Sequence, residues 1–168
     1  MAGDVYASFM SDIAISMPVG PSGPVLRRPV ARFRKRGGSL GLGSSNKADL
    51  LRQIEHGFPF EALLRLEENS GLPVATLAAV MGIPERTLAR RKAAGKFEPN
   101  ESARLLRIAT LFEQCVELFE GDVAGAVRWL TAGKKALNDE APLAYARTEL
   151  GAREVEDLIG RVEHGVFS

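Results

Sequence analysis

From residue 46 to the C-terminus, apolar residues recur every three to four positions, a spacing typical of amphipathic helices. The first helix is expected to start after the capping residue Asn46 and to end at Gly57, and the second to open at Pro59 and run to Ser70. Their predicted inward-facing residues are Leu50, Leu51 and Ile54, then Phe60, Leu63, Leu64 and Leu66. Further helices are expected at about 73–81, 84–94, 100–120, 122–131, 141–147 and 149–164. No segment shows sustained β alternation, so the pattern predicts an all-α fold.

Residues 1–46 have a different composition, rich in Gly, Pro and Ser, which favours a mostly disordered leader. The apolar residues between Val5 and Ile15 fit a helical and an extended contact element equally well. The chain therefore divides into three predicted parts: a flexible basic leader at 1–46, a helical unit at 47–99 and a second helical unit at 100–168.

Charge is distributed unevenly along the chain although the net charge is only +1. Residues 1–46 hold six basic and two acidic groups, and 71–100 hold five and two. Residues 47–70 hold three and five, and 101–168 hold eight and twelve. This asymmetry favours one surface for a polyanion and another for a different partner.

Residues 72–91 have the pattern of a helix-turn-helix. Gly82 would allow the tight turn, Leu77, Val80 and Ile83 would pack the first helix and the corner, and Leu88 would anchor the second. The second helix of such a motif enters the major groove of DNA. The residues placed to contact bases or phosphates are Glu85, Arg86, Thr87, Arg90, Arg91 and Lys92, with the exposed arginines favouring DNA over the alternative of a solvated helical hairpin.

A basic cluster upstream of this motif is a candidate DNA arm, comprising Arg32, Arg34, Lys35 and Arg36. Such a segment can lie along phosphates or in a minor groove. Basic tails are also often merely solvated, and both interpretations stay open.

The residues usual in catalytic and metal sites do not form such a constellation. Cys115 is the single cysteine and is expected to be a small core residue, and the two histidines precede Gly57 and Gly165 at helix ends, where the helix dipole favours them. Glu113, Glu117 and Glu120 fit a solvated helix face better than a catalytic pair. We therefore expect no catalytic residues, cofactor or metal. The chain shows no signal peptide or membrane-spanning run, so we expect a cytoplasmic protein without a membrane partner.

Several spaced motifs together resemble the Xre/MbcA/ParS family of antitoxins, across residues 47–168. They are Gly82-Ile83-x-x-Arg86-Thr87-Leu88-x-Arg90-Arg91, Trp129-Leu130, Ala141-Pro142-Leu143 and the helix between Gly151 and Gly165. Pro84 departs from the pattern, because a serine or a similar capping residue is usual before the second helix of the motif.

This resemblance implies an Xre-like DNA-binding domain at 47–99, followed by a toxin-binding domain at 100–168. It further implies an antitoxin that represses its own operon and blocks the active-site cleft of a RES-domain toxin that consumes NAD. The segment that would block the toxin is Glu163, His164, Gly165, Val166, Phe167 and Ser168. The apolar side chain of Phe167 could fill the dry part of a nucleotide cleft, and the terminal carboxylate could stand where a phosphate would bind. If the family resemblance is set aside, a frayed C-terminal tail is the favoured interpretation of these residues.

Two function classes remain compatible with these patterns. One is the antitoxin, and the other is a stand-alone transcriptional regulator whose C-terminal domain only dimerises. A homodimer is expected in both, because one helix-turn-helix reads a single half-site and operators are commonly palindromic.

Overall fold

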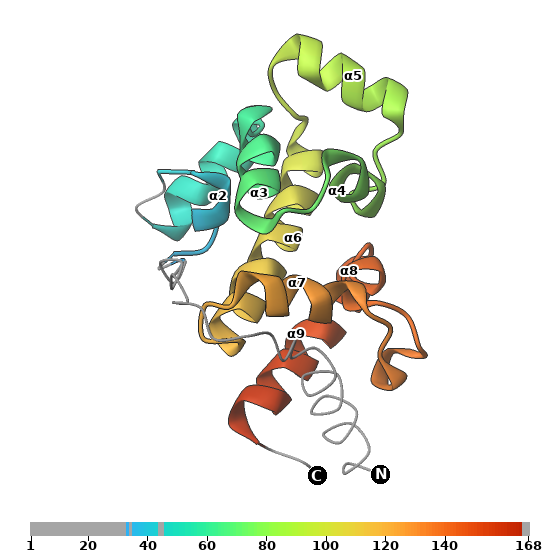
Figure 1. Ribbon diagram of the computed structural model, residues 1–168. Helices are drawn as coiled ribbons and strands as arrows, with labels where there is room; N and C mark the ends of the chain where they lie inside the picture. The colour runs from blue at the N-terminus through green and yellow to red at the C-terminus, as the bar shows by residue number, and fades with distance from the viewer. Residues whose placement is uncertain (1–32, 34, 44–45, 166–168) are drawn as a thin grey trace, which may run out of the picture.

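The computed structural model describes residues 33, 35–43 and 46–165, and these residues form an all-helical protein (Figure 1). Its elements are η1 (Gly38–Leu40), α2 (Lys47–His56), α3 (Glu61–Ser70), α4 (Val74–Val80), α5 (Glu85–Ala94), α6 (Pro99–Leu118), α7 (Val123–Thr131), η2 (Lys135–Leu137), α8 (Pro142–Tyr145) and α9 (Glu149–His164). The predicted all-α fold and the order of its helices are confirmed. None of the helices in these ranges is long and apolar enough to cross a membrane.

The helix α6 is the centre of the fold. It begins with a capping box, in which the side chains of Glu98 and Glu101 each accept from the other residue's backbone N–H, and Pro99 occupies its first turn. It contacts η1, α2 and α3 on one side and α7 and α9 on another. Leu105, Leu111 and Phe112 are completely buried, so one hydrophobic core continues along the whole of α6.

Two residues predicted to face inward are exposed. Leu51 on α2 and Leu64 on α3 have exposed fractions of 51% and 41%. Each helix packs through a narrower stripe than the sequence suggested, with Leu50 buried on α2 and Leu63 and Leu66 buried on α3. The expectation that Leu51 and Leu64 belong to the core is therefore wrong.

Part of the segment predicted to be a flexible leader is held against the core. Residues 37–41 form a turn around η1, in which Ser39 and Leu40 are almost fully buried against α3 and α6. The ring of Phe33 also lies 5.6 Å from the ring of Phe112, measured between their centroids. Residues 1–32, 34, 44 and 45, which include the apolar segment between Val5 and Ile15, lie outside the described residues.

Glu113 explains why this turn is held. Its carboxylate accepts hydrogen bonds from the Ser39 hydroxyl at 2.6 Å, the Ser39 N–H at 2.8 Å and the Gly37 N–H at 3.0 Å. Glu113 is 8% exposed, so the expectation of a solvated side chain is wrong. Burial raises the pKa of this carboxyl, although the donors from Ser39 and Gly37 oppose the effect by favouring the charged form. A buried carboxylate is tolerated because these donors replace water.

The C-terminal helices α7 and α9 both pack against α6. The hydroxyl of Thr148 caps α9 by accepting from the Gly151 N–H at 3.0 Å. Cys115 is fully buried and is a core residue as predicted, and burial raises the pKa of its thiol. The ammonium of Lys134 lies over the ring of Trp129, 5.4 Å from its centroid.

Replacing Glu113 tests how strongly the turn is anchored. Glu113→Ala should lower the free energy of unfolding by about 2–3 kcal/mol, because it leaves three buried donors without their acceptor. Glu117 lies on the same helix and is exposed, so Glu117→Ala should change stability by less than about 0.5 kcal/mol. Urea denaturation of both variants measures the difference, and equal losses would contradict the anchoring role.

Candidate functional site

The helices α4 and α5 form the helix-turn-helix that the sequence predicted. Gly82 adopts a positive φ of 68° in the turn between them, and the Ile83 N–H donates to the Ala78 carbonyl at 2.9 Å. Leu77 and Ile83 are buried at the corner. The sequence pattern thus placed the turn and its packing residues correctly.

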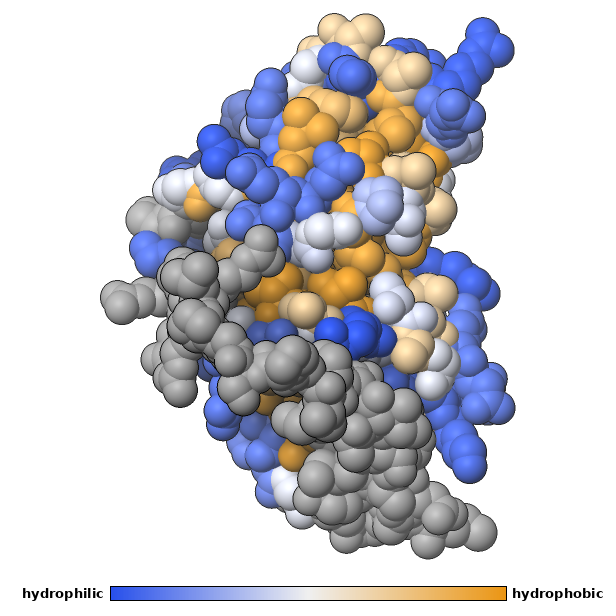
Figure 2. All heavy atoms as spheres, in the orientation of Figure 1, coloured by the Kyte–Doolittle hydropathy of each residue, from blue (hydrophilic) through white to orange (hydrophobic). Residues whose placement is uncertain are grey.

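The helix α5 stands away from the rest of the protein, at the top of Figure 1. Within the described residues, none of the side chains of α5 is buried, and Leu88 is its half-buried contact with the core. On the face shown in Figure 2, hydrophobic atoms gather below α5, over the region of α3, α4 and α6. This arrangement leaves the outer face of α5 accessible to a large partner.

Most of the predicted DNA-contacting residues lie on that accessible helix. Glu85, Arg86, Arg90 and Lys92 are exposed, and Thr87 is half-buried. Arg86, Arg90 and Lys92 form no ion pair with any residue in the described ranges, so their charges are available to an anionic partner. Pro84 precedes α5 and provides no side-chain cap, which leaves the amides of the first turn open to solvent or to an acceptor.

Arg91 does not share this exposed face. Its side chain is 15% exposed and points to the start of α6, where its Nε lies 2.7 Å from Glu101 Oε2 and its Nη1 3.1 Å from Glu98 Oε1. The expectation that Arg91 is exposed is therefore wrong. The hydrogen bond to Glu101 raises the pKa of Arg91. Burial opposes ionisation of Glu101, but the donors from Arg91 and from the Glu98 N–H outweigh it and lower the pKa of Glu101.

A backbone strap, which the sequence pattern did not indicate, holds the chain where it leaves α5. Pro59 and Lys96 form an isolated antiparallel bridge, the Phe60 N–H donates to the Gly95 carbonyl and the Phe97 N–H to the Phe58 carbonyl, both at 2.9 Å. The rings of Phe60 and Phe97 stack 5.4 Å apart. The strap joins residues almost forty positions apart, which local periodicity cannot reveal.

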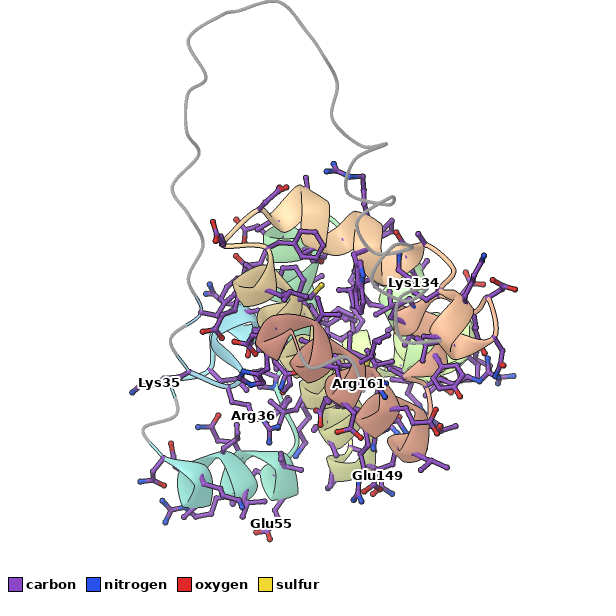
Figure 3. All side chains as sticks on the ribbon, turned by 90° about the horizontal axis from the view of Figure 1, so that it is seen from below. Lys35, Arg36, Glu55, Lys134, Glu149 and Arg161 are labelled. Carbon is purple, nitrogen blue, oxygen red and sulfur yellow. The ribbon has the colours of Figure 1, made fainter. Side chains whose placement is uncertain are left out.

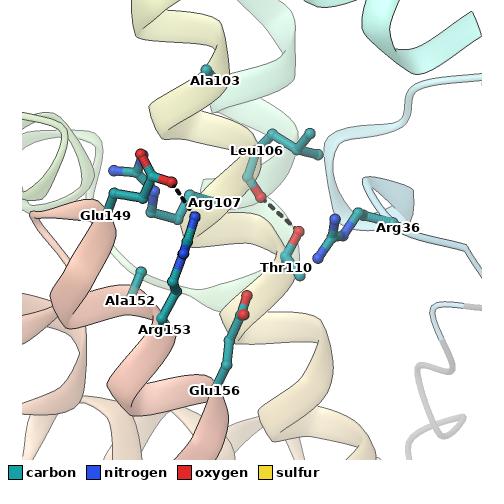
Figure 4. A pocket seen from close by; sticks show the side chains of 9 residues that line it. All are labelled: Arg36, Ala103, Leu106, Arg107, Thr110, Glu149, Ala152, Arg153 and Glu156. Carbon is teal, nitrogen blue, oxygen red and sulfur yellow. Dashed lines mark hydrogen bonds and ion pairs between the residues drawn. The ribbon is translucent and has the colours of Figure 1, made fainter. Parts of the chain in front are cut away.

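The candidate DNA arm is only partly described, since Arg32 and Arg34 lie outside the described residues. Lys35 and Arg36 are exposed, and Arg36 lines a pocket of about 310 Å³ together with residues of α6 and α9 (Figures 3 and 4). Arg107 and the ion pair of Arg153 with Glu149, at 2.6 Å, also line it. This pocket lies beside the middle of α6, whereas α5 lies beyond the N-terminal end of that helix (Figure 1).

The predicted partner-blocking segment begins at the end of α9. This helix ends at His164, and Gly165 follows in the left-handed conformation with a φ of 60°. Glu163, His164 and Gly165 are exposed. Val166, Phe167 and Ser168 lie outside the described residues.

Comparisons with known proteins match both halves of this arrangement. The model of the antitoxin Xre-like helix-turn-helix domain matches residues 49–109, and that of the antitoxin Xre/MbcA/ParS C-terminal toxin-binding domain matches residues 114–165. A protein named "Antitoxin Xre" from Yersinia enterocolitica is 37% identical over 141 residues, which are 83% of this chain and 95% of that protein. A second "Antitoxin Xre", from Photorhabdus laumondii, is 31% identical over 149 residues, 88% of this chain and 97% of that protein.

Two glycine substitutions measure what the strap contributes. Gly57 has a φ of +85°, and a Cβ there would overlap the backbone carbonyl oxygen of Phe97. Gly71 has a similar φ of +72°, but a Cβ there would meet open space. Gly71→Ala should therefore cost about 1 kcal/mol of unfolding free energy from the left-handed conformation alone, and Gly57→Ala at least about twice that. Chemical denaturation measures the two losses of unfolding free energy. Equal losses would mean that the strap accommodates the added methyl group without a loss of stability.

Proposed function

The chain belongs to the Xre family of antitoxins, and from this premise we propose that it neutralises a RES-domain toxin that consumes NAD and represses its own operon through α5. The family supplies the two activities, which are DNA binding by the helix-turn-helix and toxin binding by the C-terminal domain. The choice of toxin and of operator is our proposal. The protein itself acts by binding and carries out no catalytic step.

The DNA-binding proposal is carried by the exposed cations of α5 and their availability to a partner. The N-terminal part of the second helix of this motif enters the major groove, where an arginine can bind guanine with two hydrogen bonds. Arg86 and Arg90 lie one helical turn apart on the accessible helix, and Lys92 adds a charge for a phosphate. Glu85 and Thr87 complete the proposed contact set. Lys35 and Arg36 are not included, because they lie beside the middle of α6.

The toxin-binding proposal places the blocking segment at the end of α9. Glu163, His164 and Gly165 extend from an exposed helix end, so residues 166–168 start from a position that a partner can reach. Phe167 would fill the apolar part of the nucleotide cleft, and the terminal carboxylate of Ser168 would occupy the place of a phosphate beside basic residues. The bound segment would thereby prevent NAD from entering the active site of the toxin.

The proposal assigns residues 47–99 to DNA and residues 100–168 to the toxin, with residues 1–46 as the leader. The helix α6 opens the second unit and packs against α2 and α3 of the first, so the two units are expected to move as one body. We also propose a cytoplasmic homodimer, because two copies of α5 would read the two halves of a palindromic operator.

Alanine substitutions on α5 test the DNA interface. Arg86→Ala and Arg90→Ala should each weaken binding to the DNA upstream of the protein's own operon by about five- to a hundredfold, from the loss of a base or phosphate contact. Arg52→Ala is a control for the loss of one positive charge, because Arg52 is exposed on α2. Fluorescence anisotropy at several salt concentrations gives the affinities. Equal DNA affinities of the Arg86→Ala, Arg90→Ala and Arg52→Ala variants would exclude α5 as the interface.

Removing residues 166–168 separates the two activities. The shortened protein should bind operator DNA as well as the full chain does, since α5 lies at the opposite end of the structure from α9 (Figure 1). It should no longer rescue growth when the neighbouring toxin gene is expressed, nor restore cellular NAD. Full rescue by the shortened protein would place the inhibitory contact elsewhere on the C-terminal domain.

A further inference from the structure

The first two turns of α6 contact the helix-turn-helix through charged side chains. Arg104 donates from Nη1 to the backbone carbonyl of Met81 at 3.1 Å, at the turn that leads into α5. Glu101 binds Arg91 at 2.7 Å, in the last turn of α5. The start of α6 thus contacts the turn before α5 and the last turn of α5 itself.

One oxygen atom of Glu101 has two roles. Glu101 Oε2 accepts from Arg91 Nε and also from the Glu98 N–H, at 2.7 Å and 2.8 Å. The second bond closes the capping box that starts α6. The Glu101 side chain is 13% exposed, so little water competes for this oxygen. The position of Arg91 relative to the start of α6 is therefore closely defined.

The helix α5 depends on such contacts for its orientation. Helices in proteins are normally oriented by an apolar stripe buried in the core. In α5 the half-buried Leu88 is the apolar contact that packs on the core, and the strap fixes the chain only after the helix has ended. The buried corner at Ile83 and the strap fix the chain before and after α5, and Leu88 fixes one side of the helix between them. The ion pair of Arg91 with Glu101 adds a fixed point within the last turn of α5.

We propose that Glu101 is a positioning residue for DNA binding, which acts through Arg91 to fix the angle at which α5 presents Arg86 and Arg90 to the major groove. The proposal rests on the proposed DNA-binding function of α5. It assigns Arg91 to the support of the helix rather than to DNA. A negative charge beside a surface for a polyanion weakens attraction, so the carboxylate of Glu101 can assist DNA binding only through structure.

The electrostatic effect and the positioning effect of Glu101 on DNA affinity have opposite signs, which gives a direct test. Glu101→Gln removes a negative charge, so electrostatics alone would tighten DNA binding, whereas the loss of positioning weakens it. We expect weakening by about fivefold. Glu98→Gln is the matched control: it removes the same charge from the same turn, but the Glu98 side chain is 61% exposed and its pairing with Arg91 is correspondingly weak. Glu98→Gln should leave DNA affinity unchanged or slightly higher.

Arg91 variants supply the second measurement. Arg91→Ala should weaken binding without changing its dependence on salt, whereas Lys92→Ala should lower the salt slope by about one, because Lys92 is the residue proposed to contact a phosphate. Arg91→Lys should fail to restore affinity, because an ammonium cannot reproduce the fixed guanidinium geometry. The double variant Arg91→Ala with Glu101→Gln should bind no more weakly than Arg91→Ala alone, since both act on one contact.

The outcomes separate this inference from the proposed function. Glu101→Gln binding as tightly as Glu98→Gln, or Arg91→Ala lowering the salt slope as Lys92→Ala does, would overturn the positioning role while leaving α5 as the DNA interface. Failure of the wild-type chain to bind its operator would overturn the DNA-binding function itself. Binding of the toxin by each variant is the check on folding, because the C-terminal domain lies away from α5 (Figure 1). A variant that binds the toxin normally and DNA weakly supports the inference.

Discussion

The structure depends on the burial of α6 along its whole length. A helix of 20 residues spans about 30 Å, and eleven residues of α6 are buried, so it can pack against η1, α2, α3, α7 and α9 along its length. Its first turn holds α5 through the ion pair of Glu101 with Arg91, its Glu113 holds the turn at residues 37–41, and α7 and α9 also pack against it. The two matched family domains meet within this one helix, between residues 109 and 114.

The sequence predicted well those features that are decided by near neighbours along the chain. The helices, the cap at Asn46 and the turn at Gly82 each depend on residues within a few positions of one another. It failed where a charged side chain meets a partner from another element. Glu113 looked like a solvated residue because its donors are 74 and 76 positions away, and Arg91 looked exposed because its partners lie on the next helix. A single helix pattern carries no information about such pairs.

The two activities are supported by different parts of the protein. The DNA-binding proposal is supported by the exposed arginines of α5, whose positions the structure describes. The toxin-binding assignment rests on the family, with the exposed end of α9 indicating where a blocking segment would start. The continuous core around α6 places both activities on one rigid support.

The shared oxygen of Glu101 has a consequence for engineering. Because Oε2 serves both the start of α6 and the last turn of α5, the tilt of the exposed helix and the stability of the central helix cannot be adjusted separately. A library intended to change the DNA sequence proposed to be bound would therefore keep residues 91 and 101 constant and vary the outward positions of α5, such as 86 and 90. The outward side chains of α5 could then be varied while the orientation of the helix stays the same.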